Sequence, residues 1–232
     1  MSRDDQKRVA AEAAVELVQD GMVVGLGTGS TAAFAIDVLA ERVRQGLRIT
    51  GIPTSERSAK QAQAGGIRLG TLEEHHRIAL TIDGADEIAR GSLDLIKGLG
   101  GALLREKIVA AASERLVIVA DSMKLVDGLG TGVPVPVEVV PFGWQTTADR
   151  LTRLGANPVL RRDGTGQPFH TDGGNLILDC GFGPIADAAT LEQALSHVVG
   201  VVESGLFIGM ADLALVAGDA GVQRLTRAPL AG

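Results

Sequence analysis

The sequence contains only one cysteine, Cys180, among its 232 residues. A single cysteine forms neither an intrachain disulfide nor a multi-cysteine metal site. It ends the mostly apolar segment 176–180, so we expect a small buried side chain rather than a reactive thiol. A chain of this length buries roughly 70–75% of its unfolded surface on folding, so its stability requires neither a disulfide nor a metal.

Aromatic residues are also scarce, with five Phe, one Trp and no Tyr. This scarcity argues against a surface of aromatic rings on which nucleic-acid bases stack. Positive charge is limited as well, because 22 Lys and Arg stand against 28 Asp and Glu, for a net charge of −6. No basic tail or block of Lys and Arg is present to neutralise phosphates, so nucleic acid is not an expected partner.

Long apolar runs are absent. No segment reaches the ~18 consecutive apolar residues of a membrane span. The N-terminus carries acidic residues in its first turn instead of the apolar core of a signal peptide. We therefore expect no membrane partner and a cytoplasmic location. The composition, 45% apolar and 22% charged, is that of a globular protein and excludes intrinsic disorder.

Glycine, by contrast, is abundant: its 31 residues are nearly twice the average share of about 7%. Short apolar runs and amphipathic segments alternate along the first half of the chain. The expected helices cover residues 7–18, 31–43, 55–64 and 102–114, and the expected strands cover 22–26, 48–52, 67–69, 77–82, 93–96 and 116–120. This alternation predicts an α/β fold with a doubly wound, mostly parallel sheet.

The pattern changes after Lys124. Residues 128–132 are a glycine-rich linker, and residues 133–141 alternate Val with Pro. Because Pro cannot donate to a strand ladder, the latter segment is predicted to form only an edge strand or an extended connection. Helices at 142–154 and 186–198 and strands at 159–162, 175–179 and 201–204 follow. We predict a main domain of residues 1–130 plus 206–232, to which 207–216 returns as a strand, and a small α+β domain of residues 131–205.

The glycine-rich segment from Gly25 to Thr31 lies between an expected strand and an expected helix. Glycines let the backbone approach a ligand closely, and the N–H groups at a helix start attract anions. The segment lacks the third glycine of a dinucleotide-binding fingerprint and the lysine of a Walker motif. It is either a phosphate site or a tight turn with a Ser/Thr cap.

Three carboxylates occur within five residues, Asp83, Asp86 and Glu87, directly after an expected strand. Ligands of open parallel sheets bind beyond the carboxyl ends of the strands. The three negative charges repel one another unless a cation, a hydroxylated ligand or a lysine lies nearby. An EF-hand would need a longer series of ligands. A solvated Asp-Gly turn is the alternative interpretation.

Two further segments carry candidate residues. Lys97 is followed by Gly98, Gly100 and Gly101, whose amides can form an anion-binding nest. Glu106 lies about one turn into the next helix, where a surface carboxylate stabilised by the helix dipole is the alternative. Lys124 follows the strand at 116–120 and is either a ligand contact or a solvated lysine. Histidines with ligand spacing are missing, since the four are His75, His76, His170 and His197.

Together these segments resemble the ribose-5-phosphate isomerase family of type A. The resemblance is carried by residues 25–36 (GLGTGSTAAFAI), 54–58 (TSERS), 83–88 (DGADEI), 97–107 (KGLGGALLREK), 120–124 (ADSMK), 136–141 (PVEVVP) and 171–179 (TDGGNLILD). It implies a cofactor-free aldose–ketose isomerase of the non-oxidative pentose phosphate pathway, which interconverts ribose 5-phosphate and ribulose 5-phosphate. It also implies a Rossmann-like domain with a small inserted α+β domain, assembled as a homodimer or homotetramer.

The resemblance also implies roles for individual residues. Glu106 matches the family's proton acceptor, and Asp83 the base that opens the sugar ring. The implied catalytic residues are Glu106, Asp83, Asp86 and Lys97, with no metal. The implied substrate-binding residues are Lys7, Gly27, Thr28, Gly29, Ser30, Thr31, Gly84, Ala85, Gly98, Leu99, Gly100 and Lys124, of which 27–31 and Lys7 hold the phosphate. Leu99 departs from the pattern, because the family more often has glycine there.

Other functions compete with this interpretation. Another sugar-phosphate enzyme of the same fold is possible in principle, but the inserted domain and the segment 97–107 argue against an amino-sugar-phosphate isomerase or a lactone hydrolase. A coenzyme A transferase-like protein would need an acidic nucleophile in a different context. A non-catalytic sugar-phosphate sensor would need a DNA-binding segment, and no helix-turn-helix is left to assign.

Overall fold

The computed structural model of the protein describes residues 1–227. A seven-stranded sheet forms its centre, in the order β15-β14-β7-β4-β1-β2-β3. The strands are β1 (Val23–Leu26), β2 (Thr50–Pro53), β3 (Arg68–Leu69), β4 (Leu80–Asp83), β7 (Leu116–Asp121), β14 (Leu213–Gly218) and β15 (Gly221–Thr226). All pair in parallel except β15, which forms an antiparallel hairpin with β14. The predicted mostly parallel α/β sheet is confirmed.

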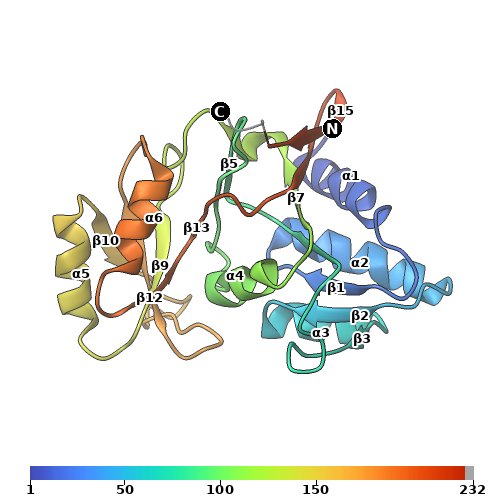
Figure 1. Cartoon of the computed structure of the whole chain (residues 1–232), viewed down its shortest axis with the longest axis horizontal. Helices are drawn as coiled ribbons and strands as arrows, with labels where there is room; N and C mark the ends of the chain where they lie inside the picture. Colours follow the sequence, from blue (N-terminus) through green and yellow to red (C-terminus); the bar gives the residue numbers. More distant parts are fainter. Residues whose placement is uncertain (228–232) are drawn as a thin grey trace.

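Helices cover both faces of this sheet (Figure 1). On one face α1 (Arg3–Val15), α2 (Ser30–Arg44) and α3 (Glu56–Ala64) share a core with Val117 and Val119 of β7. On the other face α4 (Leu103–Ala111) contributes Ala110, which packs with Leu116 and Ile118 of the same strand. The burial of β7 on both faces explains why its sequence is apolar from Leu116 to Ala120.

Helix α1 begins four residues before its predicted start at residue 7. The reason is a capping box at its N-terminus. The Ser2 hydroxyl accepts a hydrogen bond from the Asp5 N–H, and the Asp5 carboxylate accepts one from the Ser2 N–H. These bonds satisfy amide donors that a helix end otherwise leaves without partners, so the polar first turn is helical.

None of the helices within residues 1–227 is long and apolar enough to cross a membrane.

A small four-stranded sheet lies beside the main one, in the order β13-β6-β5-β8. Its strands are β5 (Glu87–Ala89), β6 (Leu95–Ile96), β8 (Leu125–Val126) and β13 (Leu206–Phe207). The strand predicted at 93–96 therefore exists, shortened, but does not join the parallel sheet. The strand predicted at 207–216 is split, because β13 pairs with β6 and only β14 returns to the main sheet.

A third sheet, in the order β10-β11-β9-β12, comes from the middle of the chain. It consists of β9 (Val135–Val139), β10 (Asn157–Leu160), β11 (Leu176–Gly181) and β12 (Val201–Ser204), and packs with α5 (Trp144–Arg153) and α6 (Ala188–Ser196). All of these elements come from one continuous stretch of the chain, residues 135–204. This supports the predicted small domain of residues 131–205 beside a main domain of residues 1–130 plus 206–232, and these domain boundaries stay a prediction. Residues 228–232 of that predicted domain lie outside the described residues.

Strand β9 corrects the prediction for residues 133–141. It is an interior strand, paired with β11 and β12, and all five of its residues are buried. Pro136 is tolerated there because it lies beside Gly205, just beyond the end of β12. The Gly205 N–H donates to the Pro136 carbonyl at 2.7 Å, while the Gly205 carbonyl accepts the Lys97 N–H at 2.8 Å. The hydrogen bond that Pro136 cannot donate is thus supplied by Lys97.

Candidate active site

The carboxyl ends of β1, β4 and β7 lie side by side at one edge of the main sheet. Leu26 of β1 is in register with Ile82 of β4, and Asp83 is in register with Ile118 of β7. Strand β2, which follows β1 along the chain, lies on one side of β1, and β4 and β7 lie on its other side. Open α/β sheets bind ligands in the crevice at such a reversal of strand order.

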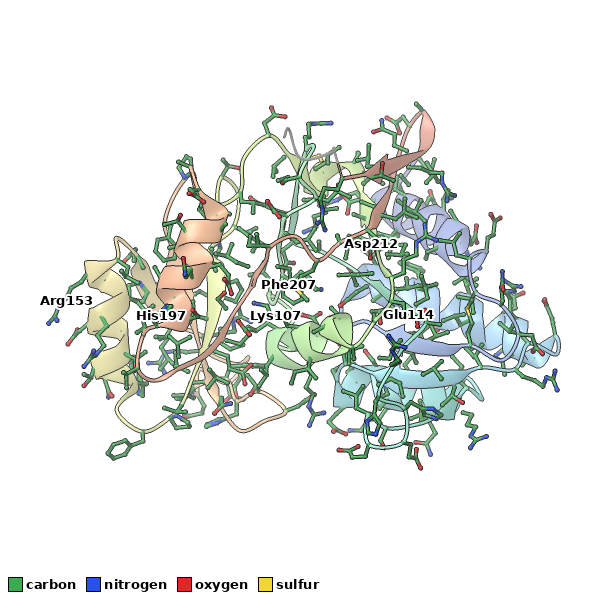
Figure 2. All side chains as sticks on the ribbon, in the orientation of Figure 1. Lys107, Glu114, Arg153, His197, Phe207 and Asp212 are labelled. Carbon is green, nitrogen blue, oxygen red and sulfur yellow. The ribbon has the colours of Figure 1, made fainter. Side chains whose placement is uncertain are left out.

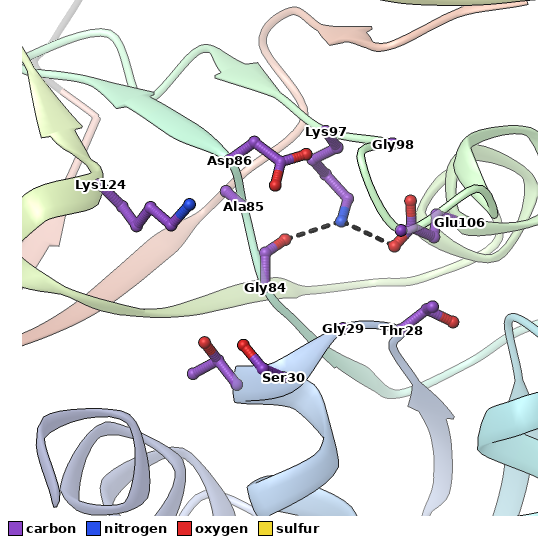
Figure 3. A pocket seen from close by; sticks show the side chains of 12 residues that line it. Thr28, Gly29, Ser30, Gly84, Ala85, Asp86, Lys97, Gly98, Glu106 and Lys124 are labelled. Atoms are coloured by element: carbon purple, nitrogen blue, oxygen red, sulfur yellow. Dashed lines mark hydrogen bonds and ion pairs between the residues drawn. The ribbon is translucent and has the colours of Figure 1, made fainter. Parts of the chain in front are cut away.

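Lys97 is the centre of the site. It follows β6, and its Nζ lies 3.0 Å from Asp83 Oδ2 and 3.1 Å from Glu106 Oε1. It also donates to the Gly84 carbonyl at 2.7 Å. The three charged residues are almost inaccessible, with exposures of 2% for Lys97, 1% for Asp83 and 3% for Glu106. Figure 3 shows the lysine between Gly84 and Glu106, with Asp86 and Lys124 beyond it.

The position of Lys97 is set by three elements. Its backbone is tied to Gly205 at the end of β12, as described above. Its ammonium lies 5.4 Å from the centre of the Phe207 ring of β13. Lys107 of α4 lies 5.0 Å from the same ring and is paired with Glu203, and Figure 2 shows it beside Phe207. Packing between the sheets therefore limits the freedom of a side chain that is normally flexible.

Burial dominates the electrostatics of the cluster. It raises the pKa of Glu106 to about 8, opposed by the charge of Lys97 and assisted by Asp83 and Asp86. Burial also raises the pKa of Asp83. Burial alone would lower the pKa of Lys97, but the two carboxylates outweigh it and raise that pKa. The site therefore holds a permanent ammonium beside a carboxyl group able to gain or lose a proton near neutral pH.

One oxygen of Glu106 is left for chemistry. Oε1 pairs with Lys97, whereas Oε2 is buried and has no hydrogen-bond partner among the described residues. A buried carboxylate oxygen without a partner costs free energy, so natural proteins rarely keep one without use. Glu106 also lines the pocket in front of the cluster. The arrangement is that of a proton acceptor awaiting a ligand.

The pocket brings together most of the residues that the sequence indicated. Those that line it are Thr28, Gly29, Ser30, Thr31, Gly84, Ala85, Asp86, Lys97, Gly98, Gly100, Glu106 and Lys124. One wall is the start of α2, where Gly29 has a φ of +117°, a conformation suited to glycine, and leads into Ser30. The first amides of the helix and Lys124 place positive potential at this wall.

Four predicted residues do not line this pocket. Asp83 and Gly27 lie behind it. Lys7 is paired with Asp4 at 3.0 Å and lines an adjoining cavity that also contains Ser30 and Lys124. Leu99 is 39% exposed, and its N–H donates to Asp86 Oδ2 at 2.9 Å.

Gly27 supports Asp83. Asp83 Oδ1 accepts hydrogen bonds from the N–H groups of Thr28 and Gly84, at 3.0 Å and 2.7 Å, while Oδ2 faces Lys97. A Cβ on Gly27 would lie 2.1 Å from Asp83 Oδ1 and 2.6 Å from its Cα. Only glycine leaves room for the carboxylate at this position.

Replacing Gly27 with Ala is therefore expected to lower both stability and any activity that depends on Asp83. Overpacking of this kind costs about 1–3 kcal/mol, which thermal denaturation measures. Gly128→Ala is the matched control, since a Cβ there meets nothing within 4 Å. A Gly27→Ala variant with the melting temperature and activity of the control would show that Asp83 is not held in this way.

No role was predicted for Thr54, Ser55 and Ser58, whose hydroxyls form a cluster with that of Thr28 beneath the turn. The Thr28 hydroxyl is bonded to those of Thr54 and Ser55 at 2.7 Å, and Ser58 donates to the Gly27 carbonyl at 2.7 Å. All four side chains are buried. The available signal was the polar segment 54–58 directly after β2, at the same sheet edge as the glycine turn. These hydroxyls brace the turn that forms the pocket wall.

A metal has no ligand set in the part of the chain that the structure describes, where no group of three or more His, Cys, Asp or Glu side chains could hold an ion. Between the carboxylates of Asp83 and Glu106, the position of a cation is taken by the Lys97 ammonium.

Cys180 is completely buried, and burial raises its thiol pKa to about 12. Its prediction as a small buried hydrophobe is confirmed.

Comparison with known proteins gives one consistent family. Residues 50–221 match the model of ribose 5-phosphate isomerase A (phosphoriboisomerase A). A protein named ribose-5-phosphate isomerase A from Gloeobacter violaceus is 66% identical over 97% of this chain and 98% of its own length. Its namesake from Gluconobacter oxydans is 56% identical over 94% of both chains.

Solved structures agree with the sequence relatives. A D-ribose-5-phosphate isomerase in complex with phospho-erythronic acid has a TM-score of 0.95 and 37% identity, covering 98% of this chain and 100% of its own. The ribose 5-phosphate isomerase A of Methanocaldococcus jannaschii has a TM-score of 0.93 and 41% identity, covering 97% and 100%. On its sequence and its fold, this chain belongs to the ribose 5-phosphate isomerase A family.

Proposed function

We propose that the protein interconverts ribose 5-phosphate and ribulose 5-phosphate through an enediolate, with Glu106 moving the proton between C1 and C2. The observation that carries this proposal is the buried ion pair between the Lys97 ammonium and Glu106. Glu106 Oε2 has no hydrogen-bond partner among the described residues. The pocket that Glu106 lines also includes the start of α2. The solved relative bound to phospho-erythronic acid supports it, because that ligand carries a phosphate at one end and a carboxylate at the other.

The phosphate is proposed to lie at the start of α2. Ser30 and Thr31 supply hydroxyls and amides there, and Lys124 faces them across the pocket. Lys7 lies in the adjoining cavity, within which it can approach the same phosphate if it leaves Asp4. A protein with net charge −6 binds a dianion by concentrating positive potential in this way.

The proton transfer follows from the geometry at Glu106. In the open-chain aldose, Glu106 removes the proton from C2. The electron pair of that C–H bond forms the C1–C2 double bond, and the carbonyl pair moves to O1. The protonated Glu106 then returns the proton to C1, while the hydroxyl proton on O2 passes to O1, which leaves the ketone at C2. One base that reaches both carbons is sufficient.

The enediolate requires donors directed at its oxygens. Lys97 supplies a fixed positive charge, and the glycine loop after it supplies amides. Asp86 lines the pocket and is the carboxylate best placed for sugar hydroxyls. Both oxygens of Asp83 are already bonded, so its contribution here is to hold Lys97. Its predicted role in opening the sugar ring remains a prediction, and it would require one of those bonds to break.

A direct assay of ribose 5-phosphate conversion, with and without EDTA, tests the proposal. We expect turnover that EDTA leaves unchanged, because Lys97 neutralises the carboxylates that would otherwise need a cation. Absence of conversion would overturn the proposed function. A large loss that added metal restores would instead contradict the proposal that Lys97 supplies the positive charge for the enediolate.

Assembly and location remain predictions derived from the family. We propose a homodimer, or a homotetramer built from such dimers, in the cytoplasm. Light scattering coupled to size-exclusion chromatography tests the assembly, and a monomeric mass at the concentration of the assay would contradict it.

A further inference from the structure

Two carbonyls of the glycine loop after Lys97 accept hydrogen bonds from a side chain of the third sheet. Arg161 follows β10, and its Nη1 donates to the carbonyls of Gly98 and Leu99, at 2.9 Å and 3.1 Å. We propose that Arg161 is a positioning residue for the isomerase reaction, which orients the amides of this loop toward the reacting oxygens. This inference rests on the proposed function.

Arg161 is itself fixed. Its Nε donates to Asp179 Oδ2 at 3.0 Å, and its Nη2 donates to Asp179 Oδ1, so the two planar groups pair in two places. Asp179 lies on β11, opposite the residue two positions before Arg161. The ring of Phe169 lies 6.0 Å from the guanidinium and also packs on Gly101, where a Cβ would come within 2.5 Å of it. A planar guanidinium held in this way has little freedom left to lose when it binds two carbonyls.

The direction of the carbonyls determines that of the amides. In a trans peptide the C=O and the following N–H point in opposite directions, and the chain has no cis bond in its described residues. With the Gly98 carbonyl directed at Arg161, the Leu99 N–H points the other way and reaches Asp86 Oδ2. With the Leu99 carbonyl directed at Arg161, the Gly100 N–H must likewise point away from it.

The Gly100 amide is the donor that this arrangement leaves for a ligand. Gly100 lines the pocket, and no acceptor for its N–H is found within residues 1–227. A backbone donor without a partner beside a buried lysine is suited to an oxyanion, because its orientation needs no reorganisation during the reaction. Arg161 therefore acts on the reaction through the backbone, without touching the substrate.

The test compares Arg161→Met with Arg162→Met. Arg162 is the adjacent residue, and its guanidinium donates to the exposed loop carbonyl of Gly166 at 2.8 Å. We expect Arg161→Met to lower kcat by about ten- to a hundredfold, less than the 10²–10³ lost when an oxyanion donor is removed outright. We expect KM to change little, Arg161→Lys to recover part of kcat, and Arg162→Met to resemble the unsubstituted protein.

Ligand binding separates positioning from folding. Phospho-erythronic acid carries a carboxylate that we expect to occupy the position of the enediolate oxygens, whereas a phosphorylated pentitol carries no such charge. Arg161→Met should weaken binding of the acid and leave binding of the phosphorylated pentitol nearly unchanged. Equal weakening of both, or an unchanged kcat, would overturn the inference. If Arg161→Met does not fold, Asp179→Asn should show the same ligand pattern with a smaller loss of kcat, and an unchanged pattern there would also overturn it.

The outcome is distinguishable from failure of the proposed function. If the unsubstituted protein does not convert ribose 5-phosphate, the proposed function fails. If it does and Arg161→Met is equally active, only the role of Arg161 fails.

Discussion

Replacing Glu106 with Gln should lower kcat at least a hundredfold, since a positioned general base contributes about 10²–10⁴ in rate. The substitution keeps the volume, the helix and an oxygen that accepts from Lys97, as Oε1 does now. It removes the pocket carboxyl whose buried Oε2 has no hydrogen-bond partner among the described residues. Exchange of solvent deuterium into the substrate should disappear together with turnover. Binding of a phosphorylated pentitol should change little, because its phosphate and hydroxyl contacts come from other residues.

Glu114→Gln is the matched control. This residue follows the same helix and is exposed, so the same chemical change should leave kcat unaltered (Figure 2).

The unsubstituted protein should lose kcat/KM as the pH falls below about 8, because Glu106 must be deprotonated to accept the proton. This acid limb should be missing from any residual activity of Glu106→Gln. A variant that retains near-normal kcat would place the base elsewhere, with Asp86 and Asp83 the next candidates.

Replacing Lys97 with Met should abolish measurable turnover and destabilise the fold. The substitution leaves Asp83 and Glu106 buried without their cation, and breaking a buried ion pair in this way costs about 3–5 kcal/mol. The pKa of Glu106, which Lys97 now lowers, should rise further, so the base is protonated at neutral pH. Lys60→Met, which removes an exposed lysine of α3, is the control and should change neither property.

The stability loss of Lys97→Met should depend on pH with a definite sign. Without the lysine, burial holds the pKa values of both carboxyls in the folded state above those in the unfolded chain. Stability is then retained below the unfolded pKa values and lost as the pH rises through the folded ones. The deficit in melting temperature relative to the unsubstituted protein should therefore be larger at about pH 8 than at about pH 5. Adding Glu106→Gln should restore part of it by removing one unpaired charge.

Much of the fold is predictable from short-range pattern. The helix of α2 and the strand β12 lie close to or at their expected positions, because the 3.6-residue and two-residue periods of apolar side chains report which face is buried. The glycine turn, the acidic segment after β4 and the loop after Lys97 were also indicated, since each follows a strand. Strand ends in a parallel sheet meet at one edge, so these segments could be expected to come together.

Other features depend on partners distant in sequence. Pattern alone predicted an edge strand or an extended connection for the Val-Pro segment, because a proline normally interrupts a ladder. It is an interior strand since Gly205 places its carbonyl where Lys97, and not Pro136, donates to it. Strand β6 belongs to a separate small sheet. Its pairing was not predictable, because a strand of two residues carries too little pattern to indicate its neighbour.

By itself, the sequence determined the alternation of helices and strands in the first half of the chain and the location of the glycine turns. These are local properties of backbone freedom, capping and apolar period. The tertiary structure decided which residues act on which. It placed Gly27 behind Asp83 instead of in the pocket, left one oxygen of Glu106 without a partner, and brought Arg161 from another sheet onto the Gly98–Leu99 carbonyls. Such contacts arise only when separate elements pack, and no local period encodes which elements will meet.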